Sequence, residues 1–169
     1  MDLEHSIHVD APPARVWELV SDLTRMPEWS PQVTSTRLRE GQQLGADAEF
    51  TNLNRHGELE WTTHGRIQRF EPERELAFRI EENWAVWSYH LEPEDGGTRL
   101  TERRATPDDI SPLSLELTEG FLGGVESFNE VLDEGIRTTL EAIRATAEAT
   151  EGASTEIAAE PAPPAARPR

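Results

Sequence analysis

Two charged residues on one expected strand are the strongest candidates for chemistry in this sequence. Glu102 and Arg104 follow Leu100 at alternate positions, and alternate side chains of a strand lie on the same face of a sheet. Leu100 marks that face as apolar, so each charge needs a partner: the other charge, a neighbour or a ligand. Burial would raise the pKa of Glu102 and suit it to proton transfer, while Arg104 could stabilise an enolate or a carboxylate. The alternative is a structural ion pair near a solvated cavity mouth.

Large aromatic residues recur on the same predicted sheet face. They would form a wall suited to planar, apolar ligands, and the alternative is an ordinary filled core. We expect Asn52 on the sheet and Asn129 on a helix to donate hydrogen bonds to a ligand carbonyl. The full set of expected ligand-binding residues is Phe50, Asn52, Trp61, Phe78, Trp87, Tyr89, Phe128, Asn129 and Leu132.

A long amphipathic helix over residues 125–147 is the element that must cover these side chains. Apolar residues recur every three or four positions and form one stripe, whereas glutamates and arginines fill the opposite side. Such a helix cannot bury its stripe alone and needs a sheet to pack against. The stripe consists of Val125, Phe128, Leu132, Ile136, Leu140, Ile143 and Ala147.

The remaining elements follow from periodicity and turn residues. Residues 3–9 alternate as a half-buried strand, and two short helices follow, one capped by Asp10 and one by Ser21 or Asp22. Short turns then separate strands that form an antiparallel meander. We place these strands near residues 33–40, 46–54, 58–70, 74–82, 84–93 and 97–106.

The two remaining segments carry weaker patterns. Residues 107–124 are irregular to weakly helical and end at Gly123-Gly124, so they form either a hinged lid over a cavity or an ordinary connector. Residues 150–169 lack any apolar period and are predicted to be a disordered Ala/Pro-rich tail after a single domain of residues 1–149.

This order of elements predicts an α+β fold of the helix-grip type. A curved antiparallel seven-stranded sheet would wrap around the long C-terminal helix, with two short helices after the first strand. At this point the chain resembles the START-like superfamily (SRPBCC), which includes polyketide cyclases, Bet v 1-like proteins and lipid-transfer proteins. The resemblance covers about residues 3–148 and rests on IHVDAP (7–12), VWEL (16–19), DLTRMPEWSP (22–31), NRHG (54–57), EWTT (60–63), WSYHLEP (87–93) and GGTRLT (96–101).

The resemblance implies a deep ligand cavity between sheet and helix. Aromatase/cyclases of aromatic polyketide assembly are similar around residues 60–65 and 87–89, but their pocket arginine would fall at about Gly65 here. Receptors and condensing enzymes of the superfamily use a pocket lysine. This chain contains no lysine, so it cannot supply that group.

Composition excludes several other classes. The net charge of −17 argues against binding to nucleic acid or to anionic membranes. Without lysine or cysteine there is no Schiff base, thiolate nucleophile, disulfide or cysteine-bound metal. The five histidines do not form a metal motif, so we expect no metal and no cofactor.

These observations predict a protein that binds a small hydrophobic, aromatic or polyketide-like ligand in an internal cavity. One version catalyses cofactor-free cyclisation or dehydration, with Glu102 and Arg104 or Asn129 moving protons. The alternatives are a non-catalytic carrier or sensor, and a co-chaperone-like protein-interaction module. The start of the chain lacks signal-peptide features and no segment is apolar enough for membrane insertion, so we expect a cytoplasmic monomer or homodimer.

Overall fold

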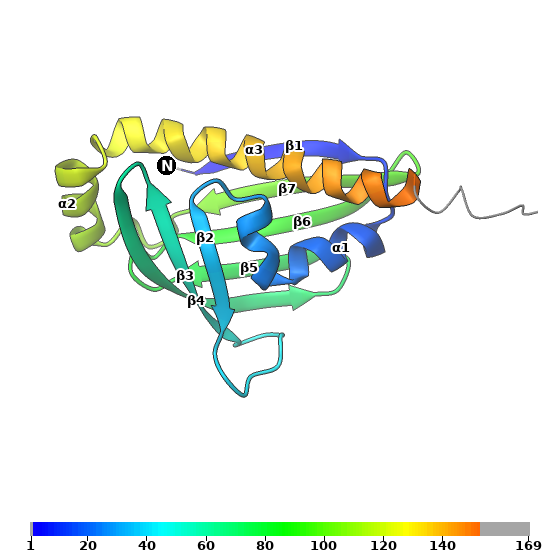
Figure 1. The fold of residues 1–169 in the computed structure, drawn as a ribbon, viewed down its shortest axis with the longest axis horizontal. Helices are drawn as coiled ribbons and strands as arrows, with labels where there is room; N and C mark the ends of the chain where they lie inside the picture. The colour runs from blue at the N-terminus through cyan, green and yellow to red at the C-terminus, as the bar shows by residue number, and fades with distance from the viewer. Residues whose placement is uncertain (1, 153–169) are drawn as a thin grey trace, which may run out of the picture.

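The computed structural model describes residues 2–152 and consists of one antiparallel sheet and three α-helices (Figure 1). Strand β1 (Leu3–Val9) leads into helix α1 (Pro13–Ser21) and the 3-10 helix η1 (Leu23–Glu28). Two helices then follow the sheet, α2 (Pro112–Phe121) and α3 (Val125–Gly152). The intervening strands are β2 (Val33–Leu38), β3 (Glu49–His56), β4 (Leu59–Glu71), β5 (Glu75–Ile80), β6 (Val86–Glu94) and β7 (Gly97–Ala105).

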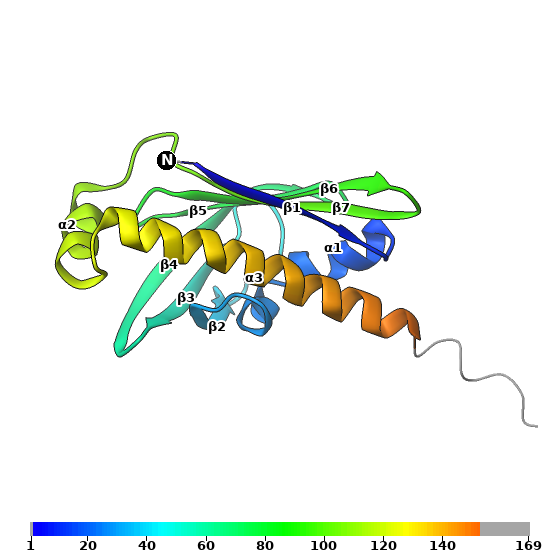
Figure 2. The same ribbon diagram turned by 90° about the horizontal axis from the view of Figure 1, so that it is seen from above.

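The sheet has seven strands in the order β1-β7-β6-β5-β4-β3-β2, and every neighbouring pair is antiparallel. From β3 to β7, each strand lies next to the one that precedes it, as the short turns predict, and β1 lies beside β7. Figure 2 shows the sheet curving so that β1 and β2 lie on either side of α3. The predicted α+β helix-grip arrangement is therefore confirmed.

The apolar stripe of α3 divides into two halves with different surroundings. Ile136, Leu140, Ile143 and Ala147 are almost completely buried against the sheet and α1 and fill the core at one end of the molecule. Phe128, near the start of the helix, is only partly buried. One end of the fold is thus closely packed, and the other keeps space between helix and sheet.

The predicted inward and outward faces of the strands are those observed. On β7 the inward-facing residues Leu100, Glu102 and Arg104 are buried. Arg103, which lies between Glu102 and Arg104, points outward and is exposed. A bulge between Ile67 and Arg69 shifts the register of β4 by one residue. The shift brings Phe70 to the inner side, where its ring contacts Trp17 edge to face at 5.1 Å.

Three expectations about local structure need correction. Asp10 does not cap α1: the helix starts later, at Pro13, because the ring of a proline suits the first turn, and Pro12 occupies the cap position without a side-chain hydrogen bond. Residues 107–124 are more regular than the irregular to weakly helical segment expected from the sequence, since they contain the ten-residue helix α2, capped by Ser111. Helix α3 continues to Gly152, so the first residues of the predicted tail are helical, and the rest of that tail lies outside the described residues.

The second short helix is as predicted. The Asp22 carboxylate accepts a hydrogen bond from the Thr24 backbone at 3.1 Å and caps η1. In the described part of the chain, no helix has the length and apolar character needed to cross a lipid bilayer.

Candidate functional site

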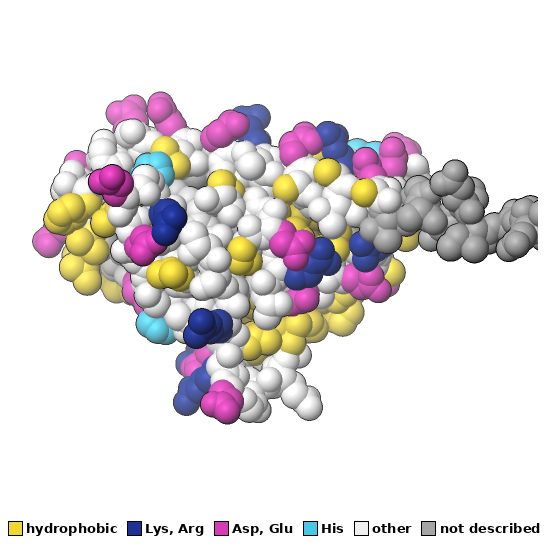
Figure 3. Space-filling model, viewed as in Figure 1, with side chains coloured by type: hydrophobic (Ala, Val, Ile, Leu, Met, Phe, Trp, Pro, Cys, Tyr) yellow, Lys and Arg dark blue, Asp and Glu magenta, His cyan; other side chains and the backbone are white. Residues whose placement is uncertain are grey.

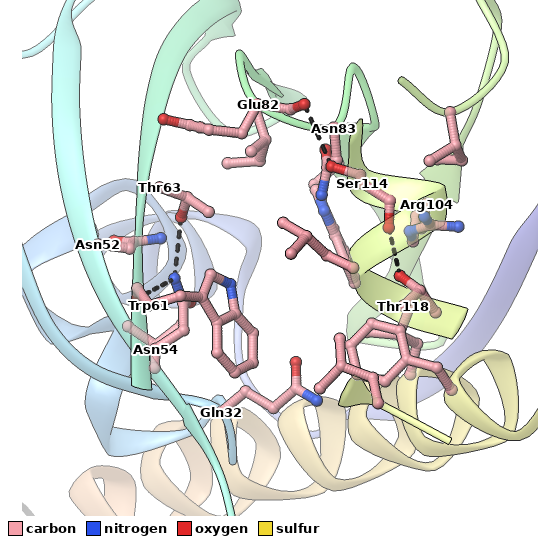
Figure 4. Close-up of a pocket in the computed structure, with 18 of the residues that line it drawn as sticks. Gln32, Asn52, Asn54, Trp61, Thr63, Glu82, Asn83, Arg104, Ser114 and Thr118 are labelled. Atoms are coloured by element: carbon pink, nitrogen blue, oxygen red, sulfur yellow. Dashed lines mark hydrogen bonds between the residues drawn. The ribbon is translucent and has the colours of Figure 1, made fainter. Parts of the chain in front are cut away.

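A cavity of about 450 Å³ lies between the sheet, α2 and the first half of α3. Its volume falls in the range of roughly 300–1,000 Å³ typical of small-molecule sites. Residues of β3–β7 form the floor and walls, the start of α3 covers one side, and α2 borders the mouth. Figure 4 shows Trp61 on one side of this space and Arg104 on the other.

The structure brings almost all of the predicted site residues together. Both predicted catalytic residues, Glu102 and Arg104, line the cavity. So do all but one of the predicted ligand-binding residues, namely Asn52, Trp61, Phe78, Trp87, Tyr89, Phe128, Asn129 and Leu132.

Phe50 is the exception and lies behind the cavity wall. Its ring contacts Phe78 edge to face at 5.2 Å and covers Gly65, where an added Cβ would lie 2.2 Å from Phe50 Cζ. Alternation correctly placed Phe50 on the inner face, but its position opposite a glycine lets the ring sink into the core. The inner face of β4 at Gly65 is therefore covered by an aromatic ring and does not border the cavity.

Glu102 is a buried carboxyl group with an incomplete set of hydrogen bonds. Only 4% of the residue is exposed, and the Tyr89 hydroxyl donates to Glu102 Oε1 at 3.2 Å. Glu102 Oε2 has no hydrogen-bond partner among residues 2–152. Burial raises the pKa of Glu102 to about 8, although the bond from Tyr89 acts in the opposite direction. At neutral pH the carboxyl group is mostly protonated and can donate a proton into the cavity.

Arg104 does not pair with Glu102. The residue is 6% exposed, and its guanidinium makes no hydrogen bond or ion pair with any residue from 2 to 152. Burial lowers the pKa of Arg104, whereas the charge of nearby Asp2 raises it. The sequence suggests either a site for proton transfer or a structural ion pair between Glu102 and Arg104. The ion pair is not observed.

The amide side chains around the cavity differ in what they can offer a ligand. Asn52 Oδ1 accepts from the Thr36 hydroxyl at 2.7 Å and Asn52 Nδ2 donates to Met26 Sδ at 3.6 Å, so its carbonyl is already engaged. Asn54 Nδ2 donates to Thr63 Oγ1 at 3.0 Å (Figure 4). Gln32 Nε2, in contrast, is buried at the cavity with no partner in the described part of the chain.

Helix α2 contributes cavity residues that the sequence reasoning missed. Ser111 donates a hydrogen bond to the Glu82 carbonyl at 2.6 Å, and Ser114 donates to the same oxygen at 3.2 Å (Figure 4 shows Ser114 and Glu82). These bonds fix the start of α2 to the β5–β6 turn. The helix has no fully buried residue, and Leu113 and Phe121 are 64% and 70% exposed although both line the cavity. Figure 3 shows hydrophobic side chains gathered at the end of the molecule where α2 lies. The Ser111-Pro112 start signal was the feature that could have revealed this helix.

Metal ligands are not clustered at the cavity or elsewhere in the described chain. No group of three or more histidine, aspartate or glutamate side chains within residues 2–152 could hold a metal ion. Three histidines instead contact one or two carboxylates: His5 contacts Asp133 at 2.7 Å and ties β1 to α3, His64 contacts Glu82 at 2.5 Å on the outer side of the sheet, and His8 lies between Asp10 and Glu94.

The chain matches the family of polyketide cyclase / dehydrase and lipid transport proteins over residues 1–148 and belongs to that family. The Zhui aromatase/cyclase from Streptomyces sp. R1128 is 19% identical, with a TM-score of 0.70 over 91% of this chain and 97% of that one. The polyketide-cyclase-like protein Cgl2372 from Corynebacterium glutamicum is 29% identical, with a TM-score of 0.58 over 92% and 96%.

A third similar structure is longer. The di-domain aromatase/cyclase StfQ from the steffimycin biosynthetic pathway is 17% identical with a TM-score of 0.71, and the match covers 89% of this chain. This chain spans about half of StfQ, 51% of its length. No curated protein matches the sequence.

Proposed function

We propose that this protein binds a small, planar and largely apolar molecule of the aromatic or polyketide class in the cavity between sheet and helix. The observation that carries the proposal is the 450 Å³ cavity, with Trp61, Phe78 and Trp87 along its walls. Aromatic side chains bind flat apolar rings through large contact areas and stacking. Membership of a family of cyclases and lipid-transport proteins supports the same conclusion.

The enzymatic form of this proposal is cofactor-free cyclisation or dehydration, with Glu102 as the acid. A buried carboxyl with a pKa of about 8 holds a proton at neutral pH and can deliver it to a hydroxyl that leaves as water. The unpartnered Glu102 Oε2 is the oxygen available for this transfer. The cavity would hold the flexible substrate in one folded shape before reaction.

A non-catalytic carrier or sensor is the second candidate. Among the cavity residues within 2–152, the ionisable side chains are Glu82, Tyr89, Glu102 and Arg104. The Glu82 carboxylate is engaged with His64, and burial raises the pKa of Tyr89 well above 10. Glu102 would therefore have to act as acid and base in turn. A carrier needs only the apolar walls and no proton transfer.

Native mass spectrometry of the protein as purified, compared with the denatured protein, tests binding. Release of a small apolar molecule on denaturation is the expected result. If no molecule is released, and aromatic polyketides and fatty acids do not raise the melting temperature, the cavity does not bind ligands of this class.

Incubation of the protein with a short poly-β-keto thioester distinguishes the enzyme hypothesis from the carrier hypothesis. The enzyme converts it to a cyclised product that has lost water, and Glu102→Gln abolishes this loss. Glu92→Gln, on the exposed side of β6, is the matched control and should retain activity. Binding without conversion identifies a carrier.

A further inference from the structure

Arg104 differs from the other arginines of the described chain in being both buried and unpaired. Arg15, Arg99 and Arg103, like most others in residues 2–152, form ion pairs with aspartate or glutamate. Arg37 and Arg74 are exposed, so water solvates them. Burial of an unpaired cation is costly, and such charges in folded proteins are normally matched by a partner.

The nearby carboxylates do not supply that partner. Glu102 shares the inner face of β7 with Arg104 but bonds to Tyr89 instead. Asp2 binds the neighbouring Arg103 at 2.6 Å on the outer side of the sheet. The Glu82 carboxylate contacts His64. The cavity thus contains a positive charge that no described side chain neutralises.

A second hydrogen-bond donor at the cavity is also without an acceptor in the described part of the chain. Gln32 Nε2 is buried at the cavity and has N–H groups without an acceptor in residues 2–152. Trp87 is the direct cross-strand partner of Arg104, so the two side chains start from neighbouring positions on one sheet face, and both line the cavity. A molecule lying on Trp87 would have its end beside Arg104.

We propose that the ligand of this cavity is an organic acid, whose carboxylate is bound by Arg104 while its apolar rings lie against Trp87, Phe78 and Trp61. This inference rests on the proposed function and specifies its ligand class. Arginine is well suited to this task because its planar guanidinium donates two parallel hydrogen bonds to a carboxylate. Gln32 Nε2 then donates to a further oxygen of the ligand, such as a ring carbonyl or hydroxyl.

A matched pair of probes tests the inference. Anthracene-2-carboxylate and anthracene-2-carboxamide have almost the same shape, but only the first is an anion at neutral pH. Fluorescence titration or calorimetry should show the carboxylate binding about tenfold more tightly or better, as expected for a charged hydrogen bond. Arg104→Gln should remove this preference and leave the affinity for the amide nearly unchanged. Arg103→Gln, one residue away on the outer face, should retain the preference.

The outcomes separate this inference from the proposed function. Equal binding of both probes by the wild-type protein, or a preference that survives Arg104→Gln, overturns the organic-acid inference but leaves the apolar cavity as a binding site. Binding of neither probe contradicts both. The melting temperature of ligand-free Arg104→Gln should equal or exceed that of the wild type, because an unpaired buried charge has been removed. A large decrease would assign Arg104 a structural role instead.

Discussion

The Tyr89 hydroxyl donates to Glu102 Oε1 across strands β6 and β7, and Glu102 Oε2 has no partner in residues 2–152. This bond favours the charged carboxylate and opposes the effect of burial on its pKa. Tyr89→Phe should therefore raise the pKa of Glu102 further above 8. Carbon NMR of glutamate-labelled protein would measure the titration, and a pKa that falls toward 4.5 would contradict this role of Tyr89.

Tyr89 is the single tyrosine of the chain, so its ionisation can be followed without interference from other phenols. Burial and the adjacent Glu102 carboxyl raise its pKa well above the ordinary value of 10. We predict that tyrosinate absorbance does not appear near pH 10 in the folded protein and develops only at higher pH or with unfolding. A midpoint near 10 while circular dichroism remains native would show that Tyr89 is open to solvent.

Glu102 should make stability depend on pH in a defined direction. Its pKa is about 8 in the folded protein and near 4.5 when unfolded, so the folded state binds more protons between these values. The contribution of Glu102 to stability is therefore greatest below pH 4.5 and decreases as the pH rises toward 8. The total effect is on the order of 5 kcal/mol.

The variant Glu102→Gln isolates this contribution from the other carboxylates. Urea unfolding at several pH values should show that the variant gains stability relative to the wild type as pH rises from 5 to 8. Parallel curves for the two proteins would indicate that Glu102 is charged and solvated in the folded state.

Gly65 and Phe50 form a complementary pair in which the ring occupies the place of a side chain. Gly65→Ala puts a methyl group 2.2 Å from Phe50 Cζ and should cost about 1–3 kcal/mol in the free energy of unfolding. Phe50→Leu has its own packing cost, but in the double variant the smaller side chain makes room, so the two effects should not add. Strict additivity in denaturant unfolding would mean that the ring and the glycine do not interact.

The fold could be predicted from sequence because its signals are periodic. The stripe of α3 and the alternation of β3–β7 each specify a face, and together they bring residues as distant as Asn52 and Leu132 to one cavity. Alternation does not specify depth or side-chain direction. It could not show that Phe50 lies behind the wall or that Glu102 binds Tyr89 rather than Arg104.

Helix α2 could not be predicted from an apolar period because it does not pack into the core. Its leucines and Phe121 face the cavity mouth and solvent, so their spacing reflects no single buried face. Gln32 lies just before β2 in a stretch without periodicity, and only the three-dimensional structure reveals its unpartnered amide.

Fluorine NMR of protein labelled with fluorotryptophan shows directly whether the cavity binds an aromatic ligand. Each of the five tryptophans gives one resonance, which single Trp→Phe variants can assign. Trp61 and Trp87 line the cavity, whereas Trp17 packs in the core against Phe70. Addition of anthracene-2-carboxylate should shift the Trp61 and Trp87 resonances in a saturable manner and leave Trp17 unchanged. Trp61 and Trp87 resonances that stay unchanged at a high concentration of the probe would show that the cavity does not bind this aromatic ligand.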